Sequence, residues 1–140
     1  MANPGAATTV TNHPSNLATN QALRLIASAQ SVDLNTVGDT IAPILVAGRV
    51  SVQSIIVTNA SVSLTTAQLA VYTGAGATGT TVKSAYALSG NTAASTVVVT
   101  SATSTAAITS TPLYLRCSTA QGAAATADIF VYGYDLTFLP

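Results

Sequence analysis

From residue 32 onward the chain consists of short runs rich in Val, Ile, Thr and Tyr, separated by small or turn-forming residues. Branched and aromatic side chains favour extended strands because they pack well on a pleated surface. No convincing long helix interrupts this pattern. The pattern predicts strands at 41–47, 50–58, 67–73, 80–87, 95–100, 112–118 and 127–138.

Seven or eight strands in a chain of 140 residues predict two packed antiparallel sheets. The expected fold class is all-β, and a jelly-roll-like antiparallel β-sandwich is the first choice. An immunoglobulin-like sandwich is the second, weakened by the missing Trp and the missing cysteine pair. The last two runs predict a hairpin, in which 121–124 turn the chain from Leu113, Leu115 and Cys117 into a strand with apolar groups on both faces.

The first part of the chain differs in composition. Residues 1–20 combine Pro, Gly and Asn with few large apolar side chains, so they predict an extended N-terminal arm. Residues 21–29 fit either a short helix or a strand, and periodicity does not decide between them. The expected organisation is an arm over 1–20 followed by a single β-sandwich domain over 21–140.

Charge is scarce, since Asp, Glu, Lys and Arg make up 6% of the residues against roughly 25% in typical soluble domains. Ser and Thr take their place, and a hydroxyl is far less costly to desolvate than a carboxylate. The formal net charge is zero. Such a surface has little electrostatic protection against association, so we expect an oligomer. The charged residues are Arg24, Asp33, Asp39, Arg49, Lys83, Arg116, Asp128 and Asp135.

The same composition argues against several functional classes. Four dispersed cations are too few to neutralise a run of phosphates or to form a basic membrane-surface patch, so no nucleic-acid or membrane partner is expected. No basic start followed by an apolar run marks a signal peptide. We therefore expect synthesis in a cytoplasm, where the sequon Asn59-Ala60-Ser61 meets no glycosylation machinery.

One string imitates a nucleotide-binding motif. Gly74, Gly76 and Gly79 fit G-x-G-x-x-G after a predicted strand. A dinucleotide site needs a helix next and an acidic residue about 20 positions on. Here the next residues favour a strand, and no acid occurs between 40 and 127. We interpret the string as a glycine-rich hairpin tip.

The other candidate residues do not assemble into a catalytic or metal site. His13 lies in the predicted arm, where a general base would not be held in place. Asp33 and Asp39 flank a loop and suggest turn chemistry. Asp128 and Asp135 are an odd number apart on one strand, so they should point to opposite faces unless a bulge intervenes near Gly133. We interpret Cys117 as a small, buried hydrophobic residue. We expect no enzymatic activity, no cofactor and no metal.

Five strings of the chain carry a family resemblance. They are Asp33-Leu34-Asn35-Thr36-Val37-Gly38-Asp39-Thr40, Ile56-Val57-Thr58-Asn59-Ala60-Ser61, Leu64-Thr65-Thr66-Ala67, Leu113-Tyr114-Leu115-Arg116 and Ala127-Asp128-Ile129-Phe130-Val131-Tyr132-Gly133-Tyr134-Asp135-Leu136. Together they resemble the small capsid decoration, or cement, proteins of tailed phages. The resemblance covers roughly residues 31 to 138, and it rests on recurring structural strings with no catalytic signature. The long Ala/Ser/Thr stretch from about 89 to 111 looks like an insertion in this chain.

The resemblance implies a β-sandwich that forms homotrimers on the capsid exterior and bridges neighbouring capsomers, with the major capsid protein as partner. No site residues transfer. The expected location is therefore the virion surface. One alternative is a receptor- or glycan-binding module of a phage fibre or spike, to which Tyr132 and Tyr134 would contribute. A small β-sandwich hydrolase is a further alternative, disfavoured by the few ionisable groups.

Overall fold

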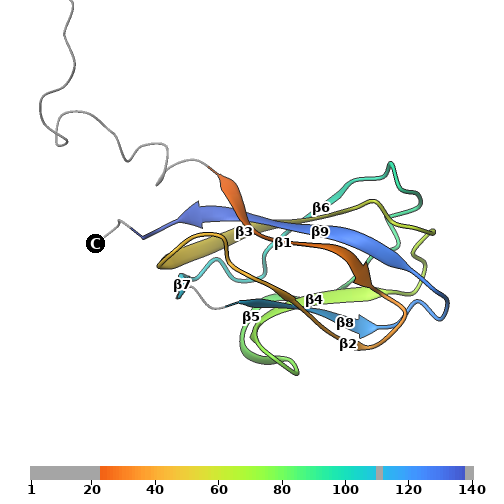
Figure 1. Ribbon diagram of the computed structural model, residues 1–140, viewed down its shortest axis with the longest axis horizontal. Helices are drawn as coiled ribbons and strands as arrows, with labels where there is room; N and C mark the ends of the chain where they lie inside the picture. The colour runs from red at the N-terminus through yellow and green to blue at the C-terminus, as the bar shows by residue number, and fades with distance from the viewer. Residues whose placement is uncertain (1–22, 110–111, 138–140) are drawn as a thin grey trace, which may run out of the picture.

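The computed structural model describes residues 23–109 and 112–137, which form two antiparallel sheets packed face to face (Figure 1). Sheet A has the strand order β1-β9-β3-β6, with the short β7 also paired to β3, and sheet B has the order β2-β8-β4-β5. The expected all-β sandwich is confirmed. The strands are β1 (Arg24–Asp33), β2 (Gly38–Ala42), β3 (Arg49–Thr58), β4 (Gln68–Gly74), β5 (Thr78–Ala87), β6 (Val98–Ser101), β7 (Ile108–Thr109), β8 (Leu113–Thr119) and β9 (Thr126–Asp135).

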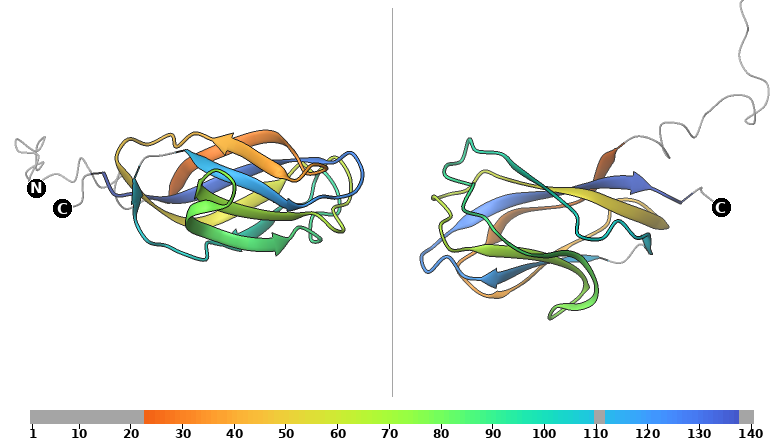
Figure 2. Two further views of the ribbon diagram at one scale, coloured as in Figure 1. Left: turned by 90° about the horizontal axis from the view of Figure 1, so that it is seen from below. Right: turned by 180° about the vertical axis from the view of Figure 1, so that it is seen from behind.

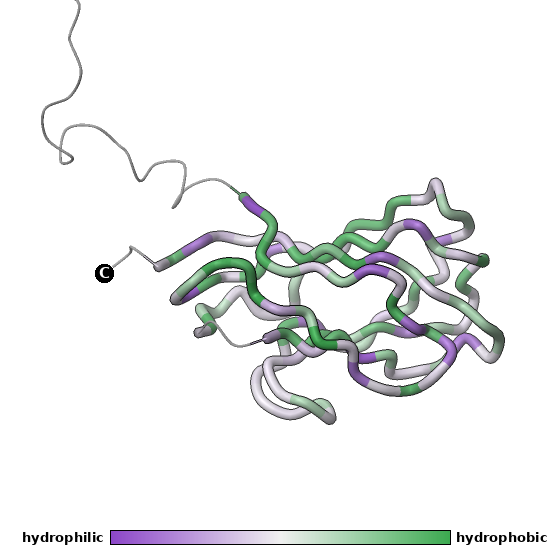
Figure 3. Tube along the Cα trace, viewed as in Figure 1, coloured by the Kyte–Doolittle hydropathy of each residue, from purple (hydrophilic) through white to green (hydrophobic). Residues whose placement is uncertain are grey.

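The core lies between the sheets because alternate residues of each strand point inward. On β9, Ile129 and Val131 are fully buried while their neighbours are only half-buried. On β8 of the facing sheet, Leu113 and Leu115 are fully buried in the same way. Such alternation places one apolar face of each sheet against the other. Figure 3 shows hydrophobic and hydrophilic positions succeeding each other along the chain.

The strands pair in a nested order. β1 pairs with β9, β2 with β8, β3 with both β6 and β7, and β4 with β5. The two ends of the described chain therefore meet in sheet A, and the innermost pair, β4 and β5, forms a hairpin in sheet B. The right-hand view of Figure 2 shows the sandwich from behind.

Connecting segments close both sides of the sandwich. After β2 the chain crosses to the edge of sheet A, where the Leu45 amide donates to the Ile26 carbonyl at 2.7 Å and Ile44 bridges Ala27. On the other side, the Thr103 amide donates to the Val82 carbonyl of β5 at 2.8 Å. These crossings satisfy part of the edge-strand backbone, which would otherwise be open to other chains.

The predicted strand at 41–47 is largely wrong, because β2 occupies Gly38–Ala42 and the chain leaves sheet B after it. Pro43 explains the break, since it has no amide hydrogen to continue the ladder with β8. The apolar residues that follow serve the crossing to β1. Figure 3 shows this hydrophobic stretch running from β2 into the loop before β3.

The predicted final hairpin is also wrong. β8 belongs to sheet B and β9 to sheet A, so the turn between them crosses from one sheet to the other. Both strands bury an alternating apolar face, and those faces meet across the core. Alternation alone fits a hairpin and a crossing equally well.

Three other segments had no firm strand prediction or an unusual composition. The ambiguous segment 21–29 overlaps β1, so its described part is a strand. The stretch 89–111, expected to be an insertion, contributes β6 and β7 to sheet A. The predicted arm over 1–20 lies outside the described residues. The remaining predicted strands overlap the observed ones, with small shifts at their ends.

Candidate interaction surfaces

The outer face of sheet A carries an apolar row. Phe130 on β9 pairs with Ser28 on β1 and Ile56 on β3, and Ile56 pairs in turn with Val99 on β6. Directly paired residues of antiparallel strands project to the same side of a sheet. The four side chains therefore cross the whole width of sheet A on the side away from the core.

A second row lies beside the first, towards the end of the sandwich where the described chain begins. Tyr132 pairs with Leu25 on β1 and Ser54 on β3, and Tyr134 pairs with Ser51. The Tyr134 residue is 37% exposed. Ser54 is half-buried beside Tyr132, whereas Ser51 is only 7% exposed and its Oγ donates to the Thr105 carbonyl at 2.6 Å. We call Ile56, Phe130, Tyr132 and Tyr134 the aromatic face.

Two ion pairs bind charges on different strands to each other. Arg24 Nη1 lies 3.2 Å from Asp135 Oδ2, and Arg116 Nη1 lies 2.9 Å from Asp39 Oδ1. The Asp135 residue is only 4% exposed, and its Oδ1 also accepts a hydrogen bond from the Thr137 amide at 2.9 Å. Asp135 therefore holds the first and last described strands together.

Other charged side chains hold turns and connections. Asp128 accepts hydrogen bonds from the Ser31 amide at 2.8 Å and the Asn59 side chain at 2.9 Å. Asp33 accepts one from the Asn35 amide at 2.8 Å. Lys83 donates to a backbone carbonyl of β6 at 2.8 Å. Each of these charged groups stabilises a turn or a connection between strands.

Arg49 is the exception. Among the charged side chains of the described residues, it alone makes no hydrogen bond or ion pair. It is exposed at the start of β3, two residues from Ser51, which pairs with Tyr134. Within residues 23–109 and 112–137, one free cation therefore borders the aromatic face, and no free carboxylate does.

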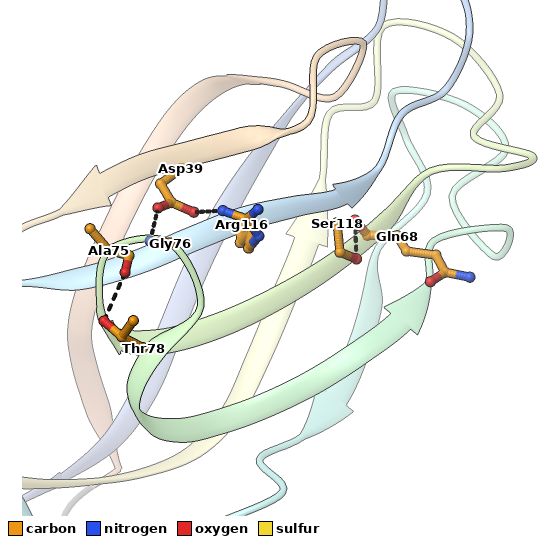
Figure 4. A network of polar contacts seen from close by, with 7 residues as sticks. All are labelled: Asp39, Gln68, Ala75, Gly76, Thr78, Arg116 and Ser118. Carbon is orange, nitrogen blue, oxygen red and sulfur yellow. Dashed lines mark hydrogen bonds and ion pairs between the residues drawn. The ribbon is translucent and has the colours of Figure 1, made fainter.

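The outer face of sheet B is partly covered by the hairpin tip between β4 and β5, which curls over β8 towards β2 (Figure 2, left). Asp39 on β2 accepts a hydrogen bond from the Gly76 amide of the tip at 2.6 Å while it binds Arg116 on β8 (Figure 4). Within the tip, Thr78 Oγ1 donates to the Ala75 carbonyl at 2.7 Å. The two outer faces thus differ, since the tip lies over sheet B, whereas the outer face of sheet A carries the exposed Tyr134 and the half-buried Ile56, Phe130 and Tyr132.

The G-x-G-x-x-G string is this hairpin tip, as expected. β4 ends at Gly74 and β5 begins at Thr78. Gly76 and Gly79 have φ angles of 66° and 72°, which glycine adopts without steric cost. The segment after the string is a strand, so no helix N-terminus is available for a pyrophosphate.

The predicted roles of the four Asp residues are confirmed with one exception. Asp33 makes the expected turn contact with its own backbone. Asp39 does not, because it lies within β2 and joins two other elements. Asp128 lies on the outer side of β9 and Asp135 on the inner side, so the two carboxylates point to opposite faces as expected.

Cys117 is buried, as expected, and its Sγ lies 3.4 Å from the Thr119 carbonyl and 3.6 Å from that of Leu34. Burial is the main cause that raises the pKa of the Cys117 thiol; the nearby Asp33 raises it further and Arg116 lowers it. The thiol is therefore held neutral. His13 lies outside the described residues.

Within residues 23–109 and 112–137, no three side chains of the His, Cys, Asp or Glu types cluster as metal ligands. Over the same residues, no helix is long and apolar enough to cross a membrane.

The sequence alone identified only half of the aromatic face. It singled out Tyr132 and Tyr134 but gave Phe130 and Ile56 no surface role. The available signal was the apolar character of both faces of β9, because only one of them can meet the core. What periodicity could not provide was the register that brings Ile56 beside Phe130.

Comparisons of the chain with protein-family models, with curated proteins and with solved structures found no match.

Proposed function

We propose that this chain is a non-enzymatic structural protein of a virus particle, which decorates the capsid exterior as a homotrimer and bridges neighbouring capsomers. The observation that carries the proposal is the aromatic face, a partly exposed apolar surface that borders no free carboxylate among the described residues. The resemblance to phage decoration proteins indicates the partner, the major capsid protein.

The physical chemistry of the aromatic face suits a protein interface. Interface cores are depleted in charge and enriched in aromatic residues, and Tyr is among the commonest residues to dominate binding energy. The half-buried Ser28 and Ser54 beside it lose little when they leave water. The hairpin tip over sheet B makes that side less suitable, so we assign the capsid contact to sheet A.

The nested strand order supports a jelly-roll interpretation of the sandwich. In a jelly roll the chain behaves as one long hairpin that is rolled into two sheets, so that its outermost strands pair with each other. The pairs β1–β9, β2–β8 and β4–β5, with β3 paired to β6 and β7, follow this order. A rigid sandwich of this kind can present a face without depending on a mobile loop.

The capsid contact is tested with one substitution on each sheet. Tyr132→Ser removes an aromatic ring from the aromatic face, and Tyr72→Ser removes a half-buried ring from the outer side of sheet B. Binding of each variant to undecorated capsids is measured by co-sedimentation, after circular dichroism confirms folding. We expect Tyr132→Ser to lose about tenfold or more in affinity, as for an interface hot spot, and Tyr72→Ser to bind as the wild type does.

Equal losses in both folded variants would argue against the aromatic face as the contact. A wild-type protein that binds no capsid at all would contradict the proposed function itself.

The alternative function is glycan or receptor binding by a fibre or spike. It is favoured by the placement of Tyr132 and Tyr134 on one face with the free Arg49 nearby. Aromatic rings and a cation are groups that can stack on and hydrogen-bond to a sugar. Binding on a glycan array that is lost in Tyr134→Ser, combined with no capsid binding, would favour this function over decoration.

A further inference from the structure

β6 is an edge strand of sheet A and pairs with β3 on one side. The Ala102 amide, just after β6, donates to the Gln53 carbonyl of β3 at 2.9 Å. Because the backbone groups of successive residues in a strand point in opposite directions, those of Ser101 and Val99 point away from β3. The Ser101 carbonyl accordingly accepts a hydrogen bond from Lys83 at 2.8 Å.

The other outward backbone groups of β6 are open. Among the described residues, no hydrogen bond reaches the N–H or C=O group of Val99 or the N–H group of Ser101. The Val99 residue is 61% exposed, and Ser101 is exposed as well. The edge therefore presents donors and an acceptor to its surroundings at the spacing of a strand.

The other sheet edges are partly closed along the described chain. The Leu45 amide donates to the Ile26 carbonyl on the β1 edge, and the Thr103 amide donates to the Val82 carbonyl on the β5 edge. β2 is followed directly by Pro43, which has no amide hydrogen. β6 is thus the edge with the least cover.

The sequence does not protect the β6 edge either. Natural edge strands carry charges, prolines or bulges that prevent another chain from pairing with them. Between Lys83 and Pro112 the chain has neither a charged residue nor a proline, and β6 pairs with β3 in unbroken register. The branched residues at 97–100 instead favour extended pairing.

The open edge adjoins the aromatic face. Val99 pairs with Ile56, so its side chain lies on the outer side of sheet A beside that face. A partner that covers both side chains also excludes water from the Val99 backbone, and a buried backbone group without a partner is costly. The partner must therefore supply hydrogen-bonding groups along β6, which an extended polypeptide does with its own backbone.

We propose that the partner of sheet A is a polypeptide that adds an extended strand to β6. Its backbone bonds to Val99 and Ser101, and its alternate side chains lie against the outer side of the sheet. The inference rests on the proposed function and deepens it, because it specifies which part of the capsid protein is recognised: an extended segment with apolar side chains on one face. In strand addition the backbone provides affinity and the alternate side chains provide specificity.

The test removes an outward amide while keeping the ladder with β3. Val99→Pro lacks the N–H group that points away from β3, a position where edge strands tolerate proline. Val99→Ala keeps the amide and controls for the lost side chain. Binding to undecorated capsids is measured by co-sedimentation. We expect Val99→Pro to bind about tenfold or more weakly than Val99→Ala, as for a lost buried hydrogen bond.

Two further substitutions check the direction of the amides. Ser101→Pro, compared with Ser101→Ala, repeats the test at a second outward amide if Val99→Pro does not fold. Thr100→Pro removes an amide that points towards β3, so it should lower the melting temperature more than Val99→Pro does. The reverse order would overturn the assigned direction and the inference with it.

Hydrogen exchange tests the wild-type chain without any substitution. Mass spectrometry with fragmentation to single residues follows the Val99 and Ser101 amides in the free protein and on capsids. We expect fast exchange in the free protein and exchange that is about tenfold or more slower on capsids. Slow exchange in the free protein would show that residues 1–22 or a second copy already cover the edge, and it would overturn the inference.

The remaining outcomes separate this inference from the proposed function. If the proline and alanine variants bind capsids equally while Tyr132→Ser loses affinity, the proposed function stands and strand addition is overturned. If the wild type binds no capsid, both are overturned. Binding on a glycan array that Val99→Pro leaves unchanged would then favour the alternative function.

Discussion

Gly133 on β9 lies against the backbone of the neighbouring strand β3 in sheet A. It pairs with Arg24 on β1 and with Val52 on β3, where the register with β3 shifts. A methyl group at this position would overlap the Ser51 carbonyl oxygen and lie 3.0 Å from the Val52 Cα atom. Both neighbours are backbone atoms in a ladder, so they cannot rotate away as a side chain would.

Gly133→Ala should therefore destabilise the protein by about 3 kcal/mol, at the upper end of overpacking costs. Gly38→Ala is the control, because its added methyl group meets nothing within 4 Å. That change should stay within about 0.5 kcal/mol. Urea unfolding followed by circular dichroism measures both. Similar midpoints for the two variants would contradict the close packing at Gly133.

Tyr86 carries a buried hydroxyl group that has no hydrogen-bond partner among the described residues. Within the described residues, its Oη is buried and makes no hydrogen bond, while Lys83 Nζ lies 5.1 Å from the ring centroid. Burial raises the pKa of the Tyr86 phenol above its ordinary value of 10.0. The folded protein therefore keeps this proton at a pH where the unfolded chain releases it.

Stability should consequently fall as the pH rises above about 9, because the native state then binds more protons than the unfolded state. Cys117 contributes in the same direction, since its pKa is raised as well. Tyr86→Phe should flatten this fall and should stabilise the protein by about 1 kcal/mol at neutral pH, because an unsatisfied hydroxyl is removed. Unfolding free energies between about pH 7 and 11 test both points. Tyr134→Phe is the exposed control, and an equal alkaline slope for the two variants would refute the role of Tyr86.

At the scale of elements, the β4–β5 hairpin depends on a contact beyond its own sheet pairing. Asp39 connects its tip to β2 and, through Arg116, to β8. Asp39→Ala should release the tip and speed hydrogen exchange of the Gly76 amide about fivefold, equivalent to about 1 kcal/mol. Asp33→Ala removes a turn contact elsewhere and should leave that amide unchanged. Identical exchange rates of the Gly76 amide in Asp39→Ala and the wild type would show that the tip keeps its conformation without Asp39.

The elements also show how far the sequence alone could predict this fold. Strand content and the alternation on β9 follow from the local sequence pattern. The all-β sandwich and the placement of Asp128 and Asp135 on opposite faces could therefore be predicted from the sequence. The partner of each strand was not, because the same alternation suits a hairpin or a crossing between sheets. The aromatic face needed the register of Ile56 with Phe130, which only the tertiary structure provides.

At the scale of the whole molecule, the capsid contact should depend little on salt. Screening weakens contacts between charges, and Arg49 is the one free charged group near the aromatic face in the part of the chain that the structure describes. We expect capsid affinity to change less than tenfold between about 50 and 500 mM salt, unlike phosphate-reading proteins. Arg49→Ser should remove most of the remaining dependence. Binding titrations at several salt concentrations measure the capsid affinity. A loss of affinity greater than tenfold over this range would show that ion pairs contribute to the contact.

The nested strand pairing also determines when a newly made chain can fold. β9 lies between β1 and β3, and the ion pair between Arg24 and Asp135 joins residues 111 positions apart. Closing so long a loop is entropically costly before any contact is gained, which slows folding. Until β9 has left the ribosome, β1 and β3 have no partner between them. A chain released early therefore lacks the central strand that carries Phe130, Tyr132 and Tyr134, and truncated copies cannot complete the surface that we propose as the capsid contact.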